Sequence, residues 1–154
     1  MAKRTVRRAR DGTFQLKLTD EERDLVASLA EQLRELLLSD QPEGVERLFP
    51  PGYSNDEERE TEYRLITHDE LLEKRLASVD VLEQTVTQTS LTEEQLTAWM
   101  GAINDLRLVL GTRLDVTEEM DRVAIDDPRA PALAVYQYLT YLLSEIVQAL
   151  SGTL

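Results

Sequence analysis

Three helix-start signals of the same kind constrain the fold of this chain more than any other feature. Each is a capping box, in which a threonine hydroxyl accepts the amide of the residue three places on, while the Glu or Gln at that place reaches back to the threonine amide. The boxes span residues 19–22, 67–70 and 92–95. Because apolar residues at three-and-four spacing follow every box, the sequence predicts a helix that begins at each one.

The apolar stripes behind these boxes supply most of the expected core. Their members are Leu25, Val26, Leu29, Leu33, Leu36, Leu37, Leu71, Leu72, Leu76, Val79, Leu82, Val86, Leu96, Trp99, Met100, Ile103, Leu106 and Leu110. We expect the first helix to end near Ser39, and a further helical stretch with an acidic first turn to begin near residues 54–55. The intervening residues are rich in Pro and Gly and hold a short helical turn at Arg47-Leu48-Phe49. A loop or short helix is expected around residues 117–120.

The last helix is expected after Asp127-Pro128, with Pro131 near its first turn. From Leu133 to Leu150 it is apolar on nearly every side. A helix of that kind is buried, either in the centre of a bundle or in an oligomer interface. We therefore expect a homodimer.

A β-hairpin is expected ahead of the helices. Residues 5–10 and 13–18 alternate with a two-residue period around Asp11-Gly12, which suits a two-residue type I′ turn. The second strand presents Phe14, Leu16 and Leu18 on one face. A lone hairpin is marginal in water, so this one must dock on the helices or pair with another chain.

These elements predict a mainly α fold, a bundle of about five helices with an N-terminal β-hairpin. The 154 residues are near the usual size of one domain, so we expect a single domain over residues 1–154. It divides into a basic hairpin arm at residues 1–18 and an acidic helical bundle at residues 19–154.

The charge of the chain is unevenly spread along it. The formal net charge is −13, yet residues 1–18 hold six basic residues and one acidic residue, Asp11. Two interpretations stay open: the arm and the body attract each other within one fold, or the arm contacts phosphate or an acidic partner. The contact interpretation assigns the nucleic-acid or partner surface to Arg4, Arg7, Arg8, Arg10 and Lys17.

Several kinds of chemistry are excluded or disfavoured. The chain has no cysteine and one histidine, which excludes disulfides, thiolate metal sites and any multi-histidine metal site within one chain. His68 lacks the Glu-x-x-His context of di-metal bundles, and no serine elbow or glycine-rich phosphate loop occurs. We interpret His68 as an exposed first-turn residue. An acidic cluster is interpreted as a solvated helix start rather than a cation site, and its members are Glu57, Glu58, Glu60 and Glu62. We therefore expect no enzyme activity, cofactor or metal.

No apolar run approaches the roughly 20 residues that a membrane span needs, so we expect a cytoplasmic protein without a membrane partner.

Polar residues interrupt the apolar helix that starts near residue 93: Asn104, Asp105, Arg107 and Arg113. Asp105 has Gly101 and Val109 four places away, so its own helix offers it no ion-pair partner there. It must face water or meet a cation from elsewhere, such as Arg113, Arg107 of a second copy, or the basic hairpin. The four residues form either a structural polar network that fixes helix register or a partner site.

The segment from Trp99 to Leu114, together with Arg47-Leu48-Phe49-Pro50-Pro51 and the basic hairpin, resembles a known family. This is an actinobacterial domain family of unknown function, often encoded beside the ClpS protease adaptor, with some members described as oxidative-stress transcriptional regulators. The resemblance covers nearly the whole chain and is most specific over residues 104–114. The regulator description implies a redox-active cysteine pair, which this chain lacks.

Two functional hypotheses follow. The first is a non-enzymatic cytoplasmic regulatory protein that acts by macromolecular contact, with transcription as one setting and without a cysteine sensor. We expect a protein partner, and nucleic acid as a further partner through the basic arm. The alternative is a structural or adaptor module that binds protein through its acidic helical face and has no nucleic-acid role.

Overall fold

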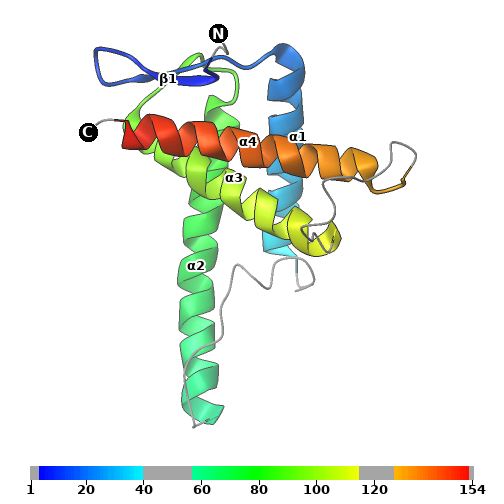
Figure 1. Cartoon of the computed structure of the whole chain (residues 1–154). Coiled ribbons are helices and arrows are strands. Elements are labelled where there is room, and N and C mark those ends of the chain that lie inside the picture. Colours follow the sequence, from blue (N-terminus) through cyan, green and yellow to red (C-terminus); the bar gives the residue numbers. More distant parts are fainter. Residues whose placement is uncertain (1–3, 40–56, 115–126, 153–154) are drawn as a thin grey trace.

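The computed structural model describes residues 4–39, 57–114 and 127–152, and Figure 1 shows their arrangement. The elements in chain order are β1 (Val6–Arg8), β2 (Phe14–Leu16), α1 (Asp20–Leu38), α2 (Glu57–Thr85), β3 (Ser90–Leu91), α3 (Glu93–Leu114) and α4 (Ala130–Ser151). The expected mainly α fold with an N-terminal hairpin is confirmed. The described residues form four helices, however, rather than about five.

The helix count is lower because the capping box at residues 67–70 does not begin a helix. α2 runs without interruption from Glu57 to Thr85. Its sequence contains no Gly or Pro, so nothing interrupts the backbone hydrogen bonds, and Thr67 lies within the helix. His68 is therefore not a first-turn residue. The turn expected at residues 47–49 and the element expected at residues 117–120 lie outside the described residues.

The other two capping boxes are confirmed. Thr19 has an extended backbone, and its hydroxyl accepts the Glu22 amide at 3.1 Å while Glu22 Oε1 accepts the Thr19 amide at 3.1 Å. At the start of α3, Thr92 Oγ1 and Gln95 Oε1 accept each other's amides at 3.1 and 2.9 Å. Both boxes satisfy amides that a helix start leaves without a partner.

α3 is the central helix of the bundle. It packs against both α2 and α4, while α2 packs against α1, and α4 crosses over α3 in the view of Figure 1. Trp99 of α3 is fully buried, and its indole N–H donates to the Thr85 hydroxyl at 2.6 Å. The first part of α2 extends away from the other helices (Figure 1).

The hairpin is confirmed, but its turn is wider than expected. Ala9 and Thr13 still pair, since the Ala9 amide donates to the Thr13 carbonyl at 2.8 Å, so three residues connect the strands instead of two. The Gly12 amide donates to the Ala9 carbonyl at 3.2 Å, and Gly12 has a φ of 87°. This is the usual form of a three-residue loop, in which the third residue has a positive φ that glycine adopts without strain.

A third strand, which the sequence did not predict, extends the hairpin into a sheet of order β1-β2-β3. β2 pairs antiparallel with both neighbours, with Val6 opposite Leu16 and Phe14 opposite Leu91. These four side chains are buried, so one face of the sheet belongs to the core. The expectation that the hairpin docks on the helices is therefore confirmed.

The last helix is not buried on every side within one chain, so the expected place in the centre of the bundle is wrong, while the alternative of an oligomer interface stays a prediction. α4 buries Leu139, Leu142 and Ile146, but Tyr141 is 47% exposed and Val147 is 42% exposed. The reason is that α4 lies on the outside of the bundle, and polar residues such as Gln137 and Thr140 share the exposed face. None of the described helices combines the length and the apolar character that crossing a membrane requires.

Candidate functional site

The five basic residues of the hairpin, here called the hairpin cations, are all exposed: Arg4, Arg7, Arg8, Arg10 and Lys17. Strand pairing separates them. Arg7 lies opposite Gln15 on the outer face of the sheet, and Lys17 follows the same alternation. Arg8 lies opposite Phe14 on the other face, with its Cζ 5.7 Å from the centroid of the Phe14 ring. Arg10 belongs to the turn, which extends past the C-terminal end of α4 in Figure 1.

The hairpin cations have no carboxylate partner within the described parts of the chain, whereas most helix arginines are engaged. Arg34 of α1 contacts both Asp80 and Glu83 of α2. The Arg129 guanidinium contacts Asp127 at 3.0 Å. The hairpin is instead attached to α4 through its backbone, because Glu145 accepts the Thr5 amide at 2.8 Å. The cations of the hairpin are therefore free to meet an external anion.

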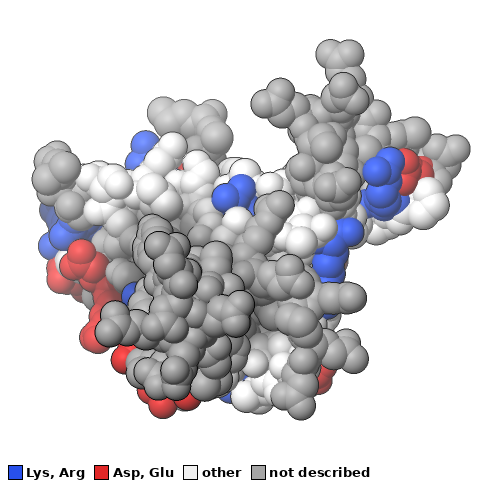
Figure 2. All heavy atoms as spheres, turned by 90° about the horizontal axis from the view of Figure 1, so that it is seen from below, with Lys and Arg blue, Asp and Glu red and all other residues white. Residues whose placement is uncertain are grey.

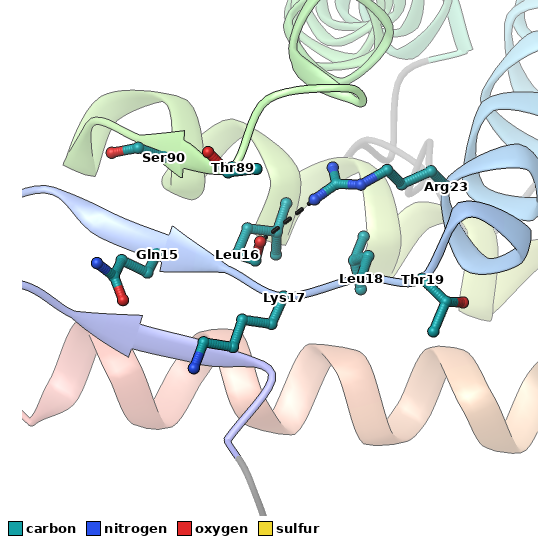
Figure 3. A pocket seen from close by; sticks show the side chains of 8 residues that line it. All are labelled: Gln15, Leu16, Lys17, Leu18, Thr19, Arg23, Thr89 and Ser90. Atoms are coloured by element: carbon teal, nitrogen blue, oxygen red, sulfur yellow. Dashed lines mark hydrogen bonds between the residues drawn. The ribbon is translucent and has the colours of Figure 1, made fainter.

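A hollow of about 540 Å³ lies next to the hairpin cations. It is formed where β2 continues toward α1 and where the chain leaves α2 for β3, as Figure 3 shows. Its lining residues are Gln15, Leu16, Lys17, Leu18, Thr19, Arg23, Thr89 and Ser90. Of these, Lys17 also belongs to the hairpin cations, so the hollow continues from that surface.

Arg23 reaches from α1 across this hollow toward β2 (Figure 3). Its Nη1 donates to the carbonyls of Val86 at 2.6 Å and Gln88 at 2.9 Å, just after α2 ends. Its Nη2 donates to the Leu16 carbonyl at 3.2 Å. One side chain thus joins α1, β2 and the segment after α2, and its positive charge is favourable near the C-terminal end of a helix.

The polar positions of α3 do not come together as one network. Asp105 is fully buried, and its Oδ1 accepts from Arg75 Nη1 of α2 at 2.6 Å. The expectation that Asp105 meets a cation from elsewhere is confirmed, but the cation is not one of those proposed from the sequence. Burial raises the pKa of Asp105 to about 6, and the positive charge of Arg75 opposes that rise.

Arg107 makes a separate contact with α4. Its Nη1 lies 3.4 Å from the Tyr136 hydroxyl, and its Cζ is 6.0 Å from the centroid of the Tyr136 ring. A Cβ added at Gly111 would come within 3.0 Å of Tyr136 Cε2, so glycine there permits this approach. Asn104 is half-buried, and Arg113 is exposed in the last turn of α3. These contacts favour a structural role for Asp105 and Arg107.

No group of three or more potential ligand residues that could hold a metal ion occurs among the described residues. The side chains of His68 and of the acidic cluster at Glu57, Glu58, Glu60 and Glu62 lie outside the described residues.

Sequence reasoning missed Arg23, Arg75 and residues 89–90. Arg75 lies between Leu72 and Leu76 on the predicted apolar stripe, and this position was a usable signal. Arg23 and residues 89–90 gave no comparable signal, because their role depends on which segments meet in space.

Curated relatives of this chain occur in mycobacteria. AosR from Mycobacterium leprae is 32% identical over 117 residues, which are 73% of this chain and 54% of that protein. The relatives from Mycobacterium tuberculosis and Mycobacterium bovis are named oxidative stress regulator AosR and are 29% identical over 117 residues. The chain spans about half the length of these relatives. No solved structure gives a significant match to the chain.

The sequence profile of the domain of unknown function DUF2017 matches residues 3–150, which is nearly the whole chain. This match confirms the resemblance found from the sequence, and the chain belongs to the DUF2017 family.

Proposed function

We propose that this chain is a non-enzymatic regulatory protein that acts by direct contact with a macromolecule, and that the hairpin cations form its contact surface. The regulator name of its mycobacterial relatives supports a regulatory role. The residues of this chain supply no cysteine for a thiol sensor, and the regulation that we propose acts through binding.

The observation that carries this proposal is the contrast between the hairpin cations and the helix arginines. Arg34 and Arg75 are held by carboxylates of neighbouring helices, whereas the hairpin cations are exposed and lack such partners in the described parts of the chain. A sheet with one buried face holds the backbone of the hairpin in place and presents these side chains to solvent. Exposed cations of this kind suit the phosphates of a nucleic acid, and such binding weakens steeply as salt is added.

The test is binding to a fluorescently labelled DNA duplex, measured by anisotropy over a series of salt concentrations. The double variant Arg7→Ala, Arg10→Ala removes two hairpin cations that lie outside the hollow and make no packing contact with Phe14. We expect weaker binding and a slope of log affinity against log salt that is smaller in magnitude by about 2.

A matched control is needed because basic side chains are not confined to the hairpin. The face of the molecule in Figure 2 shows acidic side chains gathered along one edge and basic side chains in separate small groups. The variant Lys74→Ala, Arg113→Ala removes two exposed cations of the helices and should leave the slope unchanged. If the hairpin variant binds as the unaltered protein does, or no binding occurs at low salt, the nucleic-acid role is wrong.

A second candidate function is a protein-interaction module without a nucleic-acid role. The observation that favours it is the first part of α2, which extends away from the other helices and carries the acidic residues from Glu57 onward (Figure 1). Capture from a nuclease-treated lysate should then be lost in Glu58→Lys, Glu62→Lys. The matched control is Glu31→Lys, Glu35→Lys, which reverses two exposed α1 acids at the same spacing. Equal capture by both variants would argue against this module.

A further inference from the structure

The hollow beside Arg23 has a charge that is unusual for this chain. The chain has 30 acidic residues against 17 basic ones, yet two of the eight described residues that line the hollow are cations and none is acidic. The cations, Lys17 and Arg23, come from the end of the hairpin and from α1. The hollow is therefore a positively charged place on a negatively charged protein.

The guanidinium of Arg23 is held in place by hydrogen bonds, but not all of its N–H donors are hydrogen-bonded. A guanidinium has five N–H donors, and the carbonyls of Leu16, Val86 and Gln88 take up three of them. Two donors, one on Nη2 and one on Nε, have no acceptor within the described residues. Because the three carbonyls are neutral, they fix the position of the group without neutralising its charge. A donor that is already fixed loses little conformational entropy when a ligand binds.

The backbone adds a further donor. The Leu16 amide donates to the Thr89 carbonyl at 2.8 Å. This is the last backbone hydrogen bond between the two segments, because the chain after β2 continues beyond the end of β3. Amides alternate in direction along an extended strand, so the Leu18 amide points to the same side as that of Leu16. It makes no hydrogen bond to other described residues. The exposed hydroxyls of Thr89 and Ser90 line the same hollow and also lack partners there.

We propose that this hollow binds a phosphate group, held by Arg23, the Leu18 amide, Lys17 and the hydroxyls of residues 89–90. Donors from three separate segments line the hollow, which suits an oxyanion with several acceptor oxygens better than a planar carboxylate. The Lys17 side chain points away from Arg23 in Figure 3 and would have to turn toward the hollow to contact the ligand. The group can come from a free small phosphate compound or from a nucleic-acid backbone. The second source rests on the proposed function, and the first is independent of it.

The test is a titration of isotope-labelled protein with inorganic phosphate, followed by two-dimensional NMR at constant ionic strength. We expect saturable shifts at the amides of Leu18, Thr89 and Ser90 and at the Arg23 Nε–H, with millimolar affinity. Sodium chloride at equal ionic strength should not produce them. If shifts are absent, do not saturate, or spread over the hairpin cations alone, the phosphate site is wrong.

Variants make the test specific without disturbing the fold, since Arg23 itself is left unchanged. Lys17→Ala, Ser90→Ala removes two donors on exposed side chains and should weaken phosphate binding at least fivefold. The control Arg7→Ala, Arg10→Ala leaves all lining residues in place and should bind phosphate as the unaltered protein does. Unchanged phosphate affinity in Lys17→Ala, Ser90→Ala would overturn the proposal.

The source of the phosphate is identified with the labelled DNA duplex. If DNA and inorganic phosphate compete, and Lys17→Ala, Ser90→Ala weakens both, the hollow binds a nucleic-acid phosphate. If that variant loses phosphate binding only, the hollow takes a free phosphate compound. Both results support the phosphate site. The proposed function is tested separately by the variant Arg7→Ala, Arg10→Ala, which should weaken DNA binding and leave the binding of inorganic phosphate unchanged.

Discussion

The protonation of the Asp105 side chain affects the stability of the whole fold. It is fully buried, its Oδ1 is paired with Arg75, and its Oδ2 has no hydrogen-bond partner among the described residues. Burial raises its pKa from 3.8 to about 6, so the folded state holds the proton more tightly than the unfolded state does. The stability that this proton supplies is present below pH 4 and is lost as the pH rises to about 6.

The variant Asp105→Asn should therefore gain stability relative to the unaltered protein as the pH rises. Asparagine keeps an acceptor for Arg75 but has no charge to bury. The difference in unfolding free energy between the two proteins should shift in favour of the variant by about 2 kcal/mol between pH 4 and pH 7.5. Urea unfolding at both pH values measures it, and a difference that does not change with pH would contradict the argument.

The same residue shows what a sequence can predict about a site. The absence of an ion-pair partner on its own helix indicated that Asp105 either faces water or meets a cation from elsewhere, and the structure shows the second alternative. The identity of that cation depends on how α2 packs against α3, which no local pattern encodes. Arg23 is a stronger case, because two of its three acceptors, the carbonyls of Val86 and Gln88, lie more than 60 residues away along the chain. Local patterns show which groups need partners, and packing decides which partners they get.

At the scale of elements, the stability contributed by a capping box that begins a helix can be compared with that of the same motif inside a helix. Thr92→Ala removes the hydroxyl that accepts the Gln95 amide at the start of α3 and should cost about 1 kcal/mol of unfolding free energy. Thr67→Ala alters the same sequence motif inside the continuous helix α2 and should be neutral or slightly stabilising, since alanine favours a helix interior. Thermal or urea unfolding tests both. An equal loss in the two variants would mean that α2 begins a new helix at residue 67.

Arg23 is the other test at this scale, since it joins α1, β2 and the segment after α2. Arg23→Ala leaves three carbonyls without their charged donor and should lower the unfolding free energy by about 3 kcal/mol. In the described part of the chain, the Arg129 side chain bonds only to Asp127, two residues away, so the control Arg129→Ala should have an effect within about 0.5 kcal/mol. Chemical unfolding of both variants measures the difference, and a similar small effect would show that Arg23 does not join these elements.

The elements differ in how well the sequence predicts them. Two helix starts, the hairpin and its buried face follow from capping boxes and two-residue alternation, which are local patterns. β3 is only two residues long and exists because it pairs with β2, so its sequence carries no pattern of its own. The box at residue 67 misled because a capping sequence starts a helix only where the preceding chain is not already helical. The errors thus lie where non-local pairing or helix continuity outweighs a local preference.

At the scale of the whole molecule, β1 lies beside α4, and the two elements form one surface. Among the described strands, β1 pairs only with β2. The Thr5 hydroxyl, just before β1, is 2.9 Å from the hydroxyl of Tyr141, which is 47% exposed on α4. A strand edge without a strand partner, beside an exposed aromatic residue, is a surface that a second copy of the chain could cover. This surface is the basis for proposing a homodimer.

A homodimer predicts twice the chain mass of 17.6 kDa by light scattering at micromolar concentration. Tyr141→Asp places a charge on α4 beside Thr5, where Tyr141 is 47% exposed, and should give a monomer. The matched control is Leu38→Asp, which alters an apolar residue that is 61% exposed at the end of α1, away from β1 and α4, and should leave the dimer intact. Burying a charge is costly only where the interface forms, so each variant tests its own surface. Dissociation by Leu38→Asp alone would place the interface at α1 instead. A monomer mass for the unaltered protein would contradict the homodimer.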